Sequence, residues 1–193
     1  VRMDCDDISL PERVKTQVEF METHPEVGVC GTWIRFLGDA PGIVVKNPTK
    51  HEDIVCKLLF TNPIAHPTVM IRKSSFDRYD LAYGDYRLAE DFELWQRCGR
   101  CFKLHNIPKV LLRYRVSQKS ETQTKKEELA KTVDALFERE IRTFGVSTEK
   151  EDIALHKRIG NEIPFDDISE VRRASEYLRK LSEANHKRSV YPI

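Results

Sequence analysis

Apolar residues in the first part of the chain follow two different periods. The run from Val27 to Gly38 is rich in β-branched and aromatic residues and is bounded by glycine, which predicts a β-strand. Residues 51–60 instead place apolar side chains at helical spacing and predict a short amphipathic helix. By the same criteria we predict strands at 43–45 and 66–74, a helix at 90–97, and two strands within 101–116 joined near Asn106–Pro108. Strands and helices that alternate in this way indicate an α/β fold.

The first helix is predicted to start near Ser9. Ser9 and Glu12 have the spacing of a capping box, in which the two residues satisfy each other's free backbone N–H groups. Val14, Val18 and Met21 then recur at helical spacing and predict one buried stripe along this helix.

The composition of the chain changes after Ser120. The segments 125–142, 149–161 and 168–185 are charged, helical in period and almost free of β-branched runs. We therefore predict two domains, an α/β part over 1–120 and a helical C-terminal extension over 121–193.

Composition and charge exclude several classes of protein. The 193 residues have a formal net charge of +1, which provides no overall field to attract nucleic acid, so we expect no nucleic-acid partner. No apolar run approaches the ~20 residues of a membrane span. Five scattered cysteines, mostly within apolar strings, are typical of buried free thiols in a reducing compartment. We expect a cytoplasmic protein, with peripheral attachment to the inner face of the membrane as a further expectation.

Three carboxylates, Asp4, Asp6 and Asp7, lie on the loop before the first helix. One carboxylate would suffice to interact with the helix dipole, at ~0.3–1 kcal/mol, whereas three repel one another unless a positive group lies among them. Oxygen ligands at this spacing suit Mg²⁺ or Mn²⁺, which share their coordination with substrate phosphates. An EF-hand is excluded, because the loop has no glycine at its sixth position and no glutamate at its twelfth.

A second acidic pair, Glu90 and Asp91, stands at the predicted start of an aromatic-rich helix. The pair could simply cap the helix. A carboxylate close to apolar and aromatic groups can also have a raised pKa and act as a general base. The choice between these roles depends on geometry.

Four segments together resemble family-2 glycosyltransferases of the GT-A fold: "RMDCDDISLPERVKTQVEFMETHPEVGVCGT", "NPIAHPTVMIRKSSF", "LAEDFELWQRC" and "LLRYRVSQKS". The resemblance covers roughly residues 1–120 and implies a partial GT-A mixed sheet. It implies that Asp4-Cys5-Asp6 is the DxD motif, in which Asp6 and Asp4 hold Mn²⁺ or Mg²⁺ and contact a nucleotide-sugar, with Asp7 beside them. It also implies that Asp91, next to Glu90, is the base of a direct inverting displacement.

Three further residues are candidates for the nucleotide-sugar site. His66 is expected near the donor or the acceptor, although a lone histidine between a loop and a strand is more often structural. Arg115 and Ser117 follow a strand end, in a segment that often closes over the diphosphate in the family. The family commonly has a histidine there, whereas this chain has Ser117, so the closing contact falls to Ser117, Lys119 or Ser120 or is not made. Arg115 could also simply pair with a surface carboxylate.

The implied function is transfer of a sugar, expected to come from a UDP-sugar, to a glycan or lipid-linked glycan acceptor in bacterial surface polysaccharide synthesis. Family members have a nucleotide-binding half before the DxD motif, whereas only three residues precede Asp4 here. We therefore expect the chain to be the C-terminal portion of such an enzyme, inactive by itself and able to form a homo-oligomer through an uncovered sheet edge. One alternative is a catalytically silent interaction module. Another is a phosphoryl-transfer enzyme, which fits the aspartate loop poorly.

Overall fold

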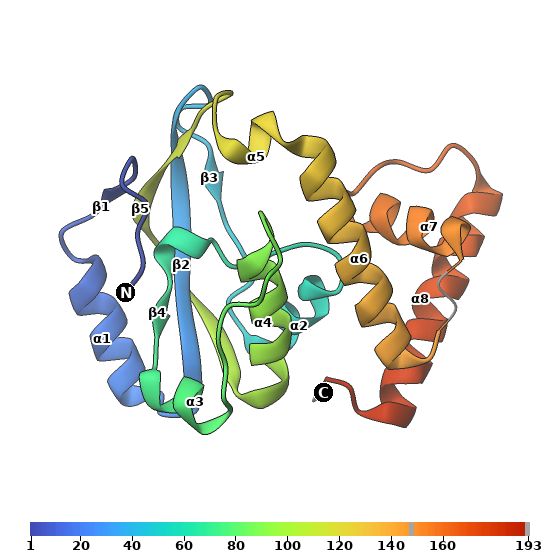
Figure 1. Cartoon of the computed structure of the whole chain (residues 1–193), viewed down its shortest axis with the longest axis horizontal. Coiled ribbons are helices and arrows are strands. Elements are labelled where there is room, and N and C mark those ends of the chain that lie inside the picture. The colour runs from blue at the N-terminus through green and yellow to red at the C-terminus, as the bar shows by residue number, and fades with distance from the viewer. Residues whose placement is uncertain (147–148, 192–193) are drawn as a thin grey trace.

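The structure is a computed structural model that describes residues 1–146 and 149–191 (Figure 1). Within these residues the chain forms one five-stranded mixed sheet with the order β1-β5-β2-β3, and β4 pairs with β2 outside this order. The strands are β1 (Ile8–Ser9), β2 (Val27–Gly38), β3 (Val44–Val45), β4 (Met70–Ile71) and β5 (Lys103–Val116). The expected mixed α/β sheet is thereby confirmed.

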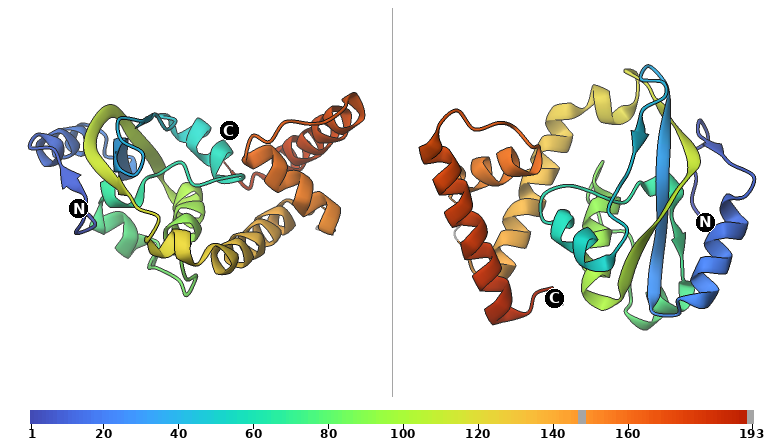
Figure 2. Two further views of the ribbon diagram at one scale, coloured as in Figure 1. Left: turned by 90° about the horizontal axis from the view of Figure 1, so that it is seen from above. Right: turned by 180° about the vertical axis from the view of Figure 1, so that it is seen from behind.

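The described helices lie on both sides of the sheet and beyond one side of it (Figures 1 and 2). They are α1 (Arg13–Thr23), α2 (His51–Leu58), η1 (His66–Thr68), α3 (Lys73–Arg78), α4 (Glu90–Cys101), α5 (Glu121–Thr124), α6 (Lys126–Phe144), α7 (Lys150–Gly160) and α8 (Ile168–Arg188). The predictions for 51–60, 90–97 and the three C-terminal segments agree with helices α2, α4, α6, α7 and α8.

The parallel pair of long strands β2 and β5 forms the centre of the sheet. The prediction of two strands within 101–116 was wrong, because β5 is continuous. Its register shifts near Pro108, where Ile107 pairs with Thr32 and Val110 pairs with Trp33. Since proline has no N–H to donate, the extra residues of this irregularity keep Pro108 out of the hydrogen-bonded ladder without ending the strand.

The predicted strand at 66–74 was wrong over most of its length. Only Met70–Ile71 is strand, and the 3₁₀-helix η1 and helix α3 occupy the rest. Pro67 suits the first turn of η1, where a missing N–H carries no penalty. The hydroxyl of Thr68 donates to the carbonyl of Ala65 over 2.7 Å, which closes the turn.

The predicted start of the first helix was also wrong. Ser9 belongs to β1 and pairs with Leu112 of β5, so its backbone is extended by the sheet and no capping box forms. Helix α1 begins at Arg13, and its N-cap residue Glu12 makes no side-chain cap hydrogen bond. Long-range strand pairing has overridden a local capping pattern.

The buried side of α1 is polar in part, contrary to the predicted stripe. Val14 and Val18 are 49% and 39% exposed, whereas Arg13 and Gln17 are buried together with Met21. The Gln17 side-chain amide donates two hydrogen bonds of 2.9 Å, one to the carbonyl of Cys30 and one to that of Thr68. Backbone carbonyls of the sheet and of η1 face this helix, and a side chain with two N–H donors satisfies both of them.

Apolar packing forms two clusters, one on each side of the sheet. The smaller cluster lies under α1 and includes Met21, Cys30 and Met70. The larger one joins the other side of the sheet and helices α2 and α4 to α6, α7 and α8. The domain boundary near residue 120 stays a prediction, and the helices that follow it share this larger cluster with the α/β part.

Two properties predicted from composition can be compared with the structure. All five cysteines are free thiols, but only Cys30 and Cys98 are buried, so the expectation that most of them are buried was wrong. Among the described residues, no helix has both the length and the apolar content to span a membrane.

Helix α7 contacts the end of α2 through a buried histidine. His156 stacks on Phe60 with 4.4 Å between ring centroids. Its Nδ1 lies 2.9 Å from the hydroxyl of Tyr177, and its Nε2 lies 2.5 Å from the carbonyl oxygen of Leu59. Burial lowers the pKa of His156 from 6.5 to about 4.

We predict that this histidine makes folding sensitive to acid. Below pH 6.5 the unfolded chain binds a proton that the folded chain accepts only near pH 4, so stability is lost as the pH falls through this window. Between pH 7.5 and pH 5 the loss from this one group is about 2 kcal/mol. Urea unfolding of the native protein and of His156→Gln at pH 7.5 and pH 5 measures this loss. The difference between the two proteins isolates His156, because they share all other titratable groups. Parallel pH dependences would contradict the prediction.

Candidate functional site

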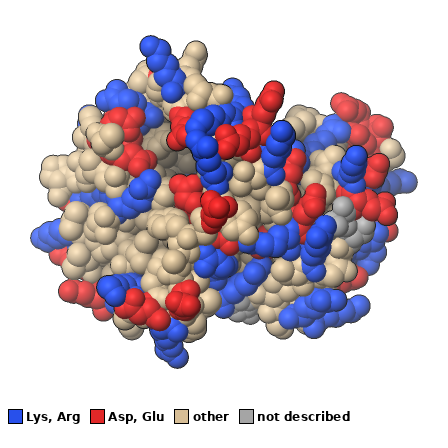
Figure 3. Space-filling model, viewed as in Figure 1, with Lys and Arg blue, Asp and Glu red and all other residues tan. Residues whose placement is uncertain are grey.

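A cavity of about 480 Å³ opens where the N-terminal segment, the β2–β3 side of the sheet, η1 and the start of α4 meet. Its lining brings together Asp4, His66, Glu90 and Asp91, four of the residues predicted from the sequence. Acidic and basic side chains are intermixed on the face of the molecule that Figure 3 shows. Recognition of a ligand would therefore depend on individual groups within the cavity and less on a field of one sign.

Asp91 is the second residue of α4 and is nearly enclosed, with its side chain 16% exposed. Its Oδ2 accepts a hydrogen bond of 2.8 Å from Nδ2 of Asn62. Burial raises the pKa of Asp91 to about 6, although hydrogen bonds from the Phe92 backbone and from Asn62 oppose the rise. The carboxylate is thus ionised at neutral pH and is still basic enough to accept a proton there.

Glu90 precedes Asp91 and lines the same cavity. Its negative charge contributes to the raised pKa of Asp91, because two adjacent carboxylates disfavour each other's ionisation. The two residues thus form one acidic pair at the start of α4.

His66 lies beside this acidic pair. Its Nε2 is 2.8 Å from the hydroxyl of Tyr83, and its Nδ1 is 3.9 Å from Oδ2 of Asp91. Burial, together with the nearby charge of Arg2, lowers the pKa of His66 to about 4. At neutral pH the imidazole is therefore uncharged, and its contact with Asp91 is not an ion pair.

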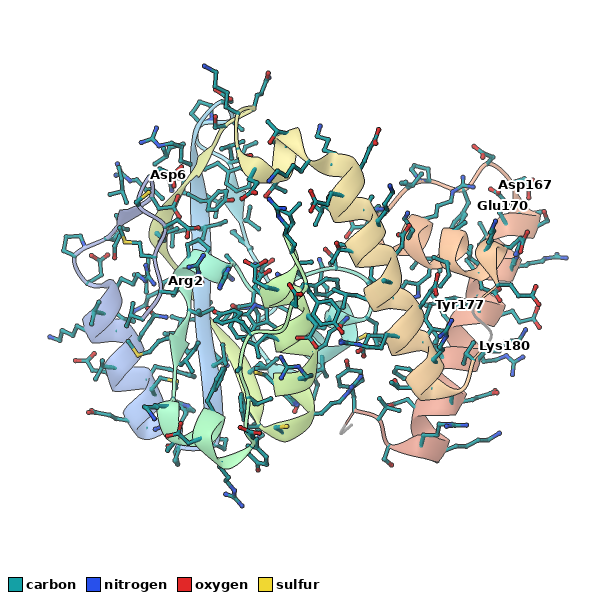
Figure 4. All side chains as sticks on the ribbon, in the orientation of Figure 1. Arg2, Asp6, Asp167, Glu170, Tyr177 and Lys180 are labelled. Atoms are coloured by element: carbon teal, nitrogen blue, oxygen red, sulfur yellow. The ribbon has the colours of Figure 1, made fainter. Side chains whose placement is uncertain are left out.

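The three aspartates of the N-terminal loop have different environments. Asp4 lines the cavity and forms an ion pair of 3.0 Å with Arg2. Asp6 is exposed and is not among the described residues that line the cavity; Figure 4 shows it on the N-terminal segment beside β1. Asp7 is buried, and its Oδ1 accepts a hydrogen bond of 2.8 Å from the backbone N–H of Arg115.

The chemistry of this loop suits a hard divalent cation. Oδ2 of Asp7 is buried without a hydrogen-bond partner in the described structure, and burial raises the pKa of this residue. Asp4, three residues earlier on the same loop, lines the cavity. No group of three His, Cys, Asp or Glu side chains within 1–146 and 149–191 is arranged to hold a metal by itself. One or two carboxylates suffice for Mg²⁺ when phosphates supply further ligands, so the donor set fits.

Arg115 and Ser117 lie at the end of β5 and outside the described lining of the cavity. Arg115 positions the acidic loop, because its Nε donates to the carbonyl of Asp6 over 2.9 Å. The hydroxyl of Ser117 accepts from the N–H of Lys119 over 3.2 Å and shapes the turn after the strand. Both side chains thus contact backbone of this region, and the structure does not bring them together with Asp91.

Sequence reasoning missed the polar partners of Asp91 and His66. Asn62 donates to Asp91 and also fixes its own loop, because its Oδ1 accepts from the N–H of Ile64 over 3.1 Å. Tyr83 orients His66. The Asn62–Pro63 dipeptide is a turn signal that marks the loop, but no local pattern indicates that this loop meets α4.

We predict that Asn62 keeps the pKa of Asp91 from rising further. In Asn62→Ala the carboxylate loses a hydrogen bond that favours its ionised form, so its pKa should rise by up to about one unit above the native value. The measurement is a carbon-13 NMR titration of the Asp91 carboxyl group in both proteins. An unchanged or lower pKa of Asp91 would show that the hydrogen bond from Asn62 does not stabilise the ionised carboxylate.

Comparison with known proteins relates this chain to one class of enzyme. No family model matches the chain. An uncharacterized glycosyltransferase of Haemophilus influenzae is 24% identical over 191 residues, which is 93% of this chain and 58% of that protein. The amylovoran biosynthesis glycosyltransferase AmsE of Erwinia amylovora is 34% identical over 119 residues, which is 59% of this chain and 43% of that protein. Other matches also have glycosyltransferase names, including one for O-antigen biosynthesis.

A solved structure shares the fold. S. aureus TarS, residues 1–349 in complex with UDP, superposes with a TM-score of 0.51 at 13% identity over 94% of this chain and 54% of that chain. The chain thus spans about half the length of the proteins that it matches. Its relatives are glycosyltransferases by name, and these names support a transferase.

Proposed function

We propose that this chain contributes the metal- and acceptor-side part of the active site of an inverting glycosyltransferase that uses a nucleotide-sugar, most simply a UDP-sugar. The observation that carries the proposal is Asp91, a nearly enclosed carboxylate with a pKa of about 6 in the same cavity as Asp4 of the acidic loop. The glycosyltransferase names of the relatives and the fold shared with UDP-bound TarS support the same class.

The reaction is a single displacement in which Asp91 accepts the acceptor's proton. The acceptor hydroxyl oxygen forms a bond to the anomeric carbon while the bond from that carbon to the diphosphate breaks. The hydroxyl proton moves to Asp91, and the nucleoside diphosphate leaves with the bonding electron pair. Inversion follows from attack opposite the leaving group. Asn62 holds the base in place, and the neutral His66 beside it adds no competing charge.

Asp4 and Asp6 are proposed to hold Mn²⁺ or Mg²⁺, with the orphaned oxygen of Asp7 as a further donor on the same loop. When bound, such an ion neutralises negative charge on the departing diphosphate. Arg115 positions this loop through its contacts with Asp6 and Asp7. The acceptor is proposed to be a glycan or a lipid-linked glycan of a bacterial polysaccharide, as in the biosynthetic roles named for the relatives.

The direct test is a screen of nucleotide-sugars on the full-length protein with added Mn²⁺, scored by released nucleoside diphosphate and by the mass of the glycosylated acceptor. The proposal expects release that depends on one or a few donors and an anomeric centre of inverted configuration. A retained configuration would overturn the inverting mechanism, whereas no turnover of any nucleotide-sugar would overturn the proposed function and favour a non-catalytic interaction module.

A further inference from the structure

A second cavity, of about 380 Å³, also has Asp91 in its lining. It opens between the end of α2, the start of α4, and helices α6 and α7. Asn62, Leu88 and Asp91 line both this cavity and the first one. Both volumes are of the size that small-ligand sites have, about 300–1,000 Å³. Asp91 thus borders both cavities, which adjoin at these three residues, and only the first also has Asp4 of the acidic loop in its lining.

An unusual backbone conformation occurs where the two cavities adjoin. Leu88 has φ of 67°, in the left-handed region that a residue with a β-carbon rarely adopts. Such conformations persist only where the surrounding structure maintains them, and they gather at ligand sites. Here the conformation occurs two residues before the Glu90–Asp91 pair, at the point where the two spaces meet.

The wall contributed by α6 is firmly attached to the helix that carries Asp91. Arg139 of α6 donates to Glu93 over 2.7 Å and to Gln96 over 3.0 Å, both on α4. Phe137 meets Phe92 edge-on with ring centroids 6.0 Å apart. The distance from this wall to the base is therefore set by a buried polar and aromatic contact between α4 and α6.

The lining of the second cavity is amphipathic. Phe60, Leu129 and Val133 provide apolar surface, and Lys157, also in the lining, forms an ion pair of 2.8 Å with Asp134. Lys126 is exposed in the first turn of α6 and forms no ion pair with any described residue. Apolar surface suits the carbon face of a sugar, and a free ammonium group suits one anionic substituent.

We propose that this second cavity is the acceptor subsite, in which helices α6 and α7 hold the terminal sugar of the acceptor against the apolar wall with its hydroxyl toward Asp91, while Lys126 binds an anionic group, phosphate or carboxylate, of the same acceptor. The inference rests on the proposed function. The segment after residue 120 is then part of substrate recognition and selects which acceptor is used. The donor occupies the first cavity, where the acidic loop can reach its diphosphate.

Filling the second cavity tests the proposal. Ala130 lines it, and Ala135 is exposed on the same helix outside it, so Ala130→Phe and Ala135→Phe are a matched pair with the same change in helix propensity. Ala130→Phe should raise the acceptor KM by about tenfold or more, and Ala135→Phe should not. Calorimetry with UDP and Mn²⁺ should give the same affinity for both variants, and thermal unfolding should show that both are folded.

Two outcomes separate this inference from the proposed function. If the native protein transfers sugar and the two phenylalanine variants have equal acceptor KM values, the acceptor subsite is refuted while the proposed function stands. If the native protein turns over no nucleotide-sugar, the proposed function itself fails.

The assignment of Lys126 has its own test. Acceptors are compared as a neutral alkyl glycoside, a phosphate-linked sugar and a uronic-acid glycoside. Lys126→Gln should lower kcat/KM for an anionic acceptor relative to the neutral one by roughly two- to fivefold, the worth of an exposed ion pair. Lys131→Gln, an exposed lysine of α6 outside the cavity, is the control. A lower ratio of kcat/KM for the phosphate or the uronic-acid acceptor to that for the neutral acceptor in Lys126→Gln supports the assignment and identifies the anionic group. The same ratios in Lys126→Gln and Lys131→Gln overturn it.

Discussion

Asp91→Asn should reduce sugar transfer by about 10²–10⁴-fold, the contribution of a positioned general base. The change is nearly isosteric, and the asparagine oxygen can still accept the hydrogen bond from Asn62, so folding and donor binding should persist. In the native protein kcat/KM should fall as the pH drops below about 6, because protonation of Asp91 removes the base. The residual activity of the variant should lack this acid limb.

Glu90→Gln is the matched control for this variant, because Glu90 lines the same cavity one residue earlier. Initial rates from pH 5 to pH 8 for the three proteins decide the assignment. Turnover of Asp91→Asn close to the native rate would leave Asp91 with only a role at the start of α4. An inactive Glu90→Gln beside an active Asp91→Asn would transfer the role of base to Glu90.

Asp4→Asn should remove most turnover, by about a hundredfold or more, because a metal at a departing diphosphate supplies several kcal/mol of transition-state stabilisation. Asp4 is the loop carboxylate that faces the cavity, whereas Asp6 is exposed. Excess chelator should abolish activity in the native protein, and added Mn²⁺ should restore it. Asp53→Asn, on the exposed side of α2, serves as the control. Full activity in chelator would contradict the metal assignment.

Asp6→Asn should also lower turnover, through the same metal. The exposed side chain of Asp6 would have to be recruited by the ion and the diphosphate, so comparison of Asp4→Asn with Asp6→Asn measures how each carboxylate contributes. Isothermal titration of both variants with UDP and Mn²⁺ separates weaker binding from slower chemistry.

The sequence predicted those elements whose pattern is local. Strand β2 was predicted with its observed bounds, because glycine limits its apolar run. The buried side of α1 was predicted only in part. Met21 is buried as expected, but Arg13 and Gln17 take the place of Val14 and Val18, because they donate hydrogen bonds to carbonyl groups of other segments. Strand β5 was divided at Pro108, since a local pattern does not reveal that a bulge can accommodate the proline.

The candidate site was predictable to the extent that its residues belong to short motifs. The Glu90–Asp91 pair and Asp4 were found in this way, and they meet in one cavity. The contact from Asn62 to Asp91 joins residues 29 positions apart, and no periodicity indicates it. The orientation of Asp6 depends on Arg115, 109 positions away, so its exposure could be learned only from the folded chain.

Gln17 has a consequence for any attempt to redesign this scaffold. Its amide donates to one carbonyl of β2 and to one of η1, the short helix that contains His66. Leucine would fill the space but remove the side-chain hydrogen bond to each carbonyl, and glutamate would bring an acceptor where two donors are present. A library that allows only apolar residues on the inward side of α1 would therefore weaken the attachment of η1 to the sheet, at a residue that lines neither cavity.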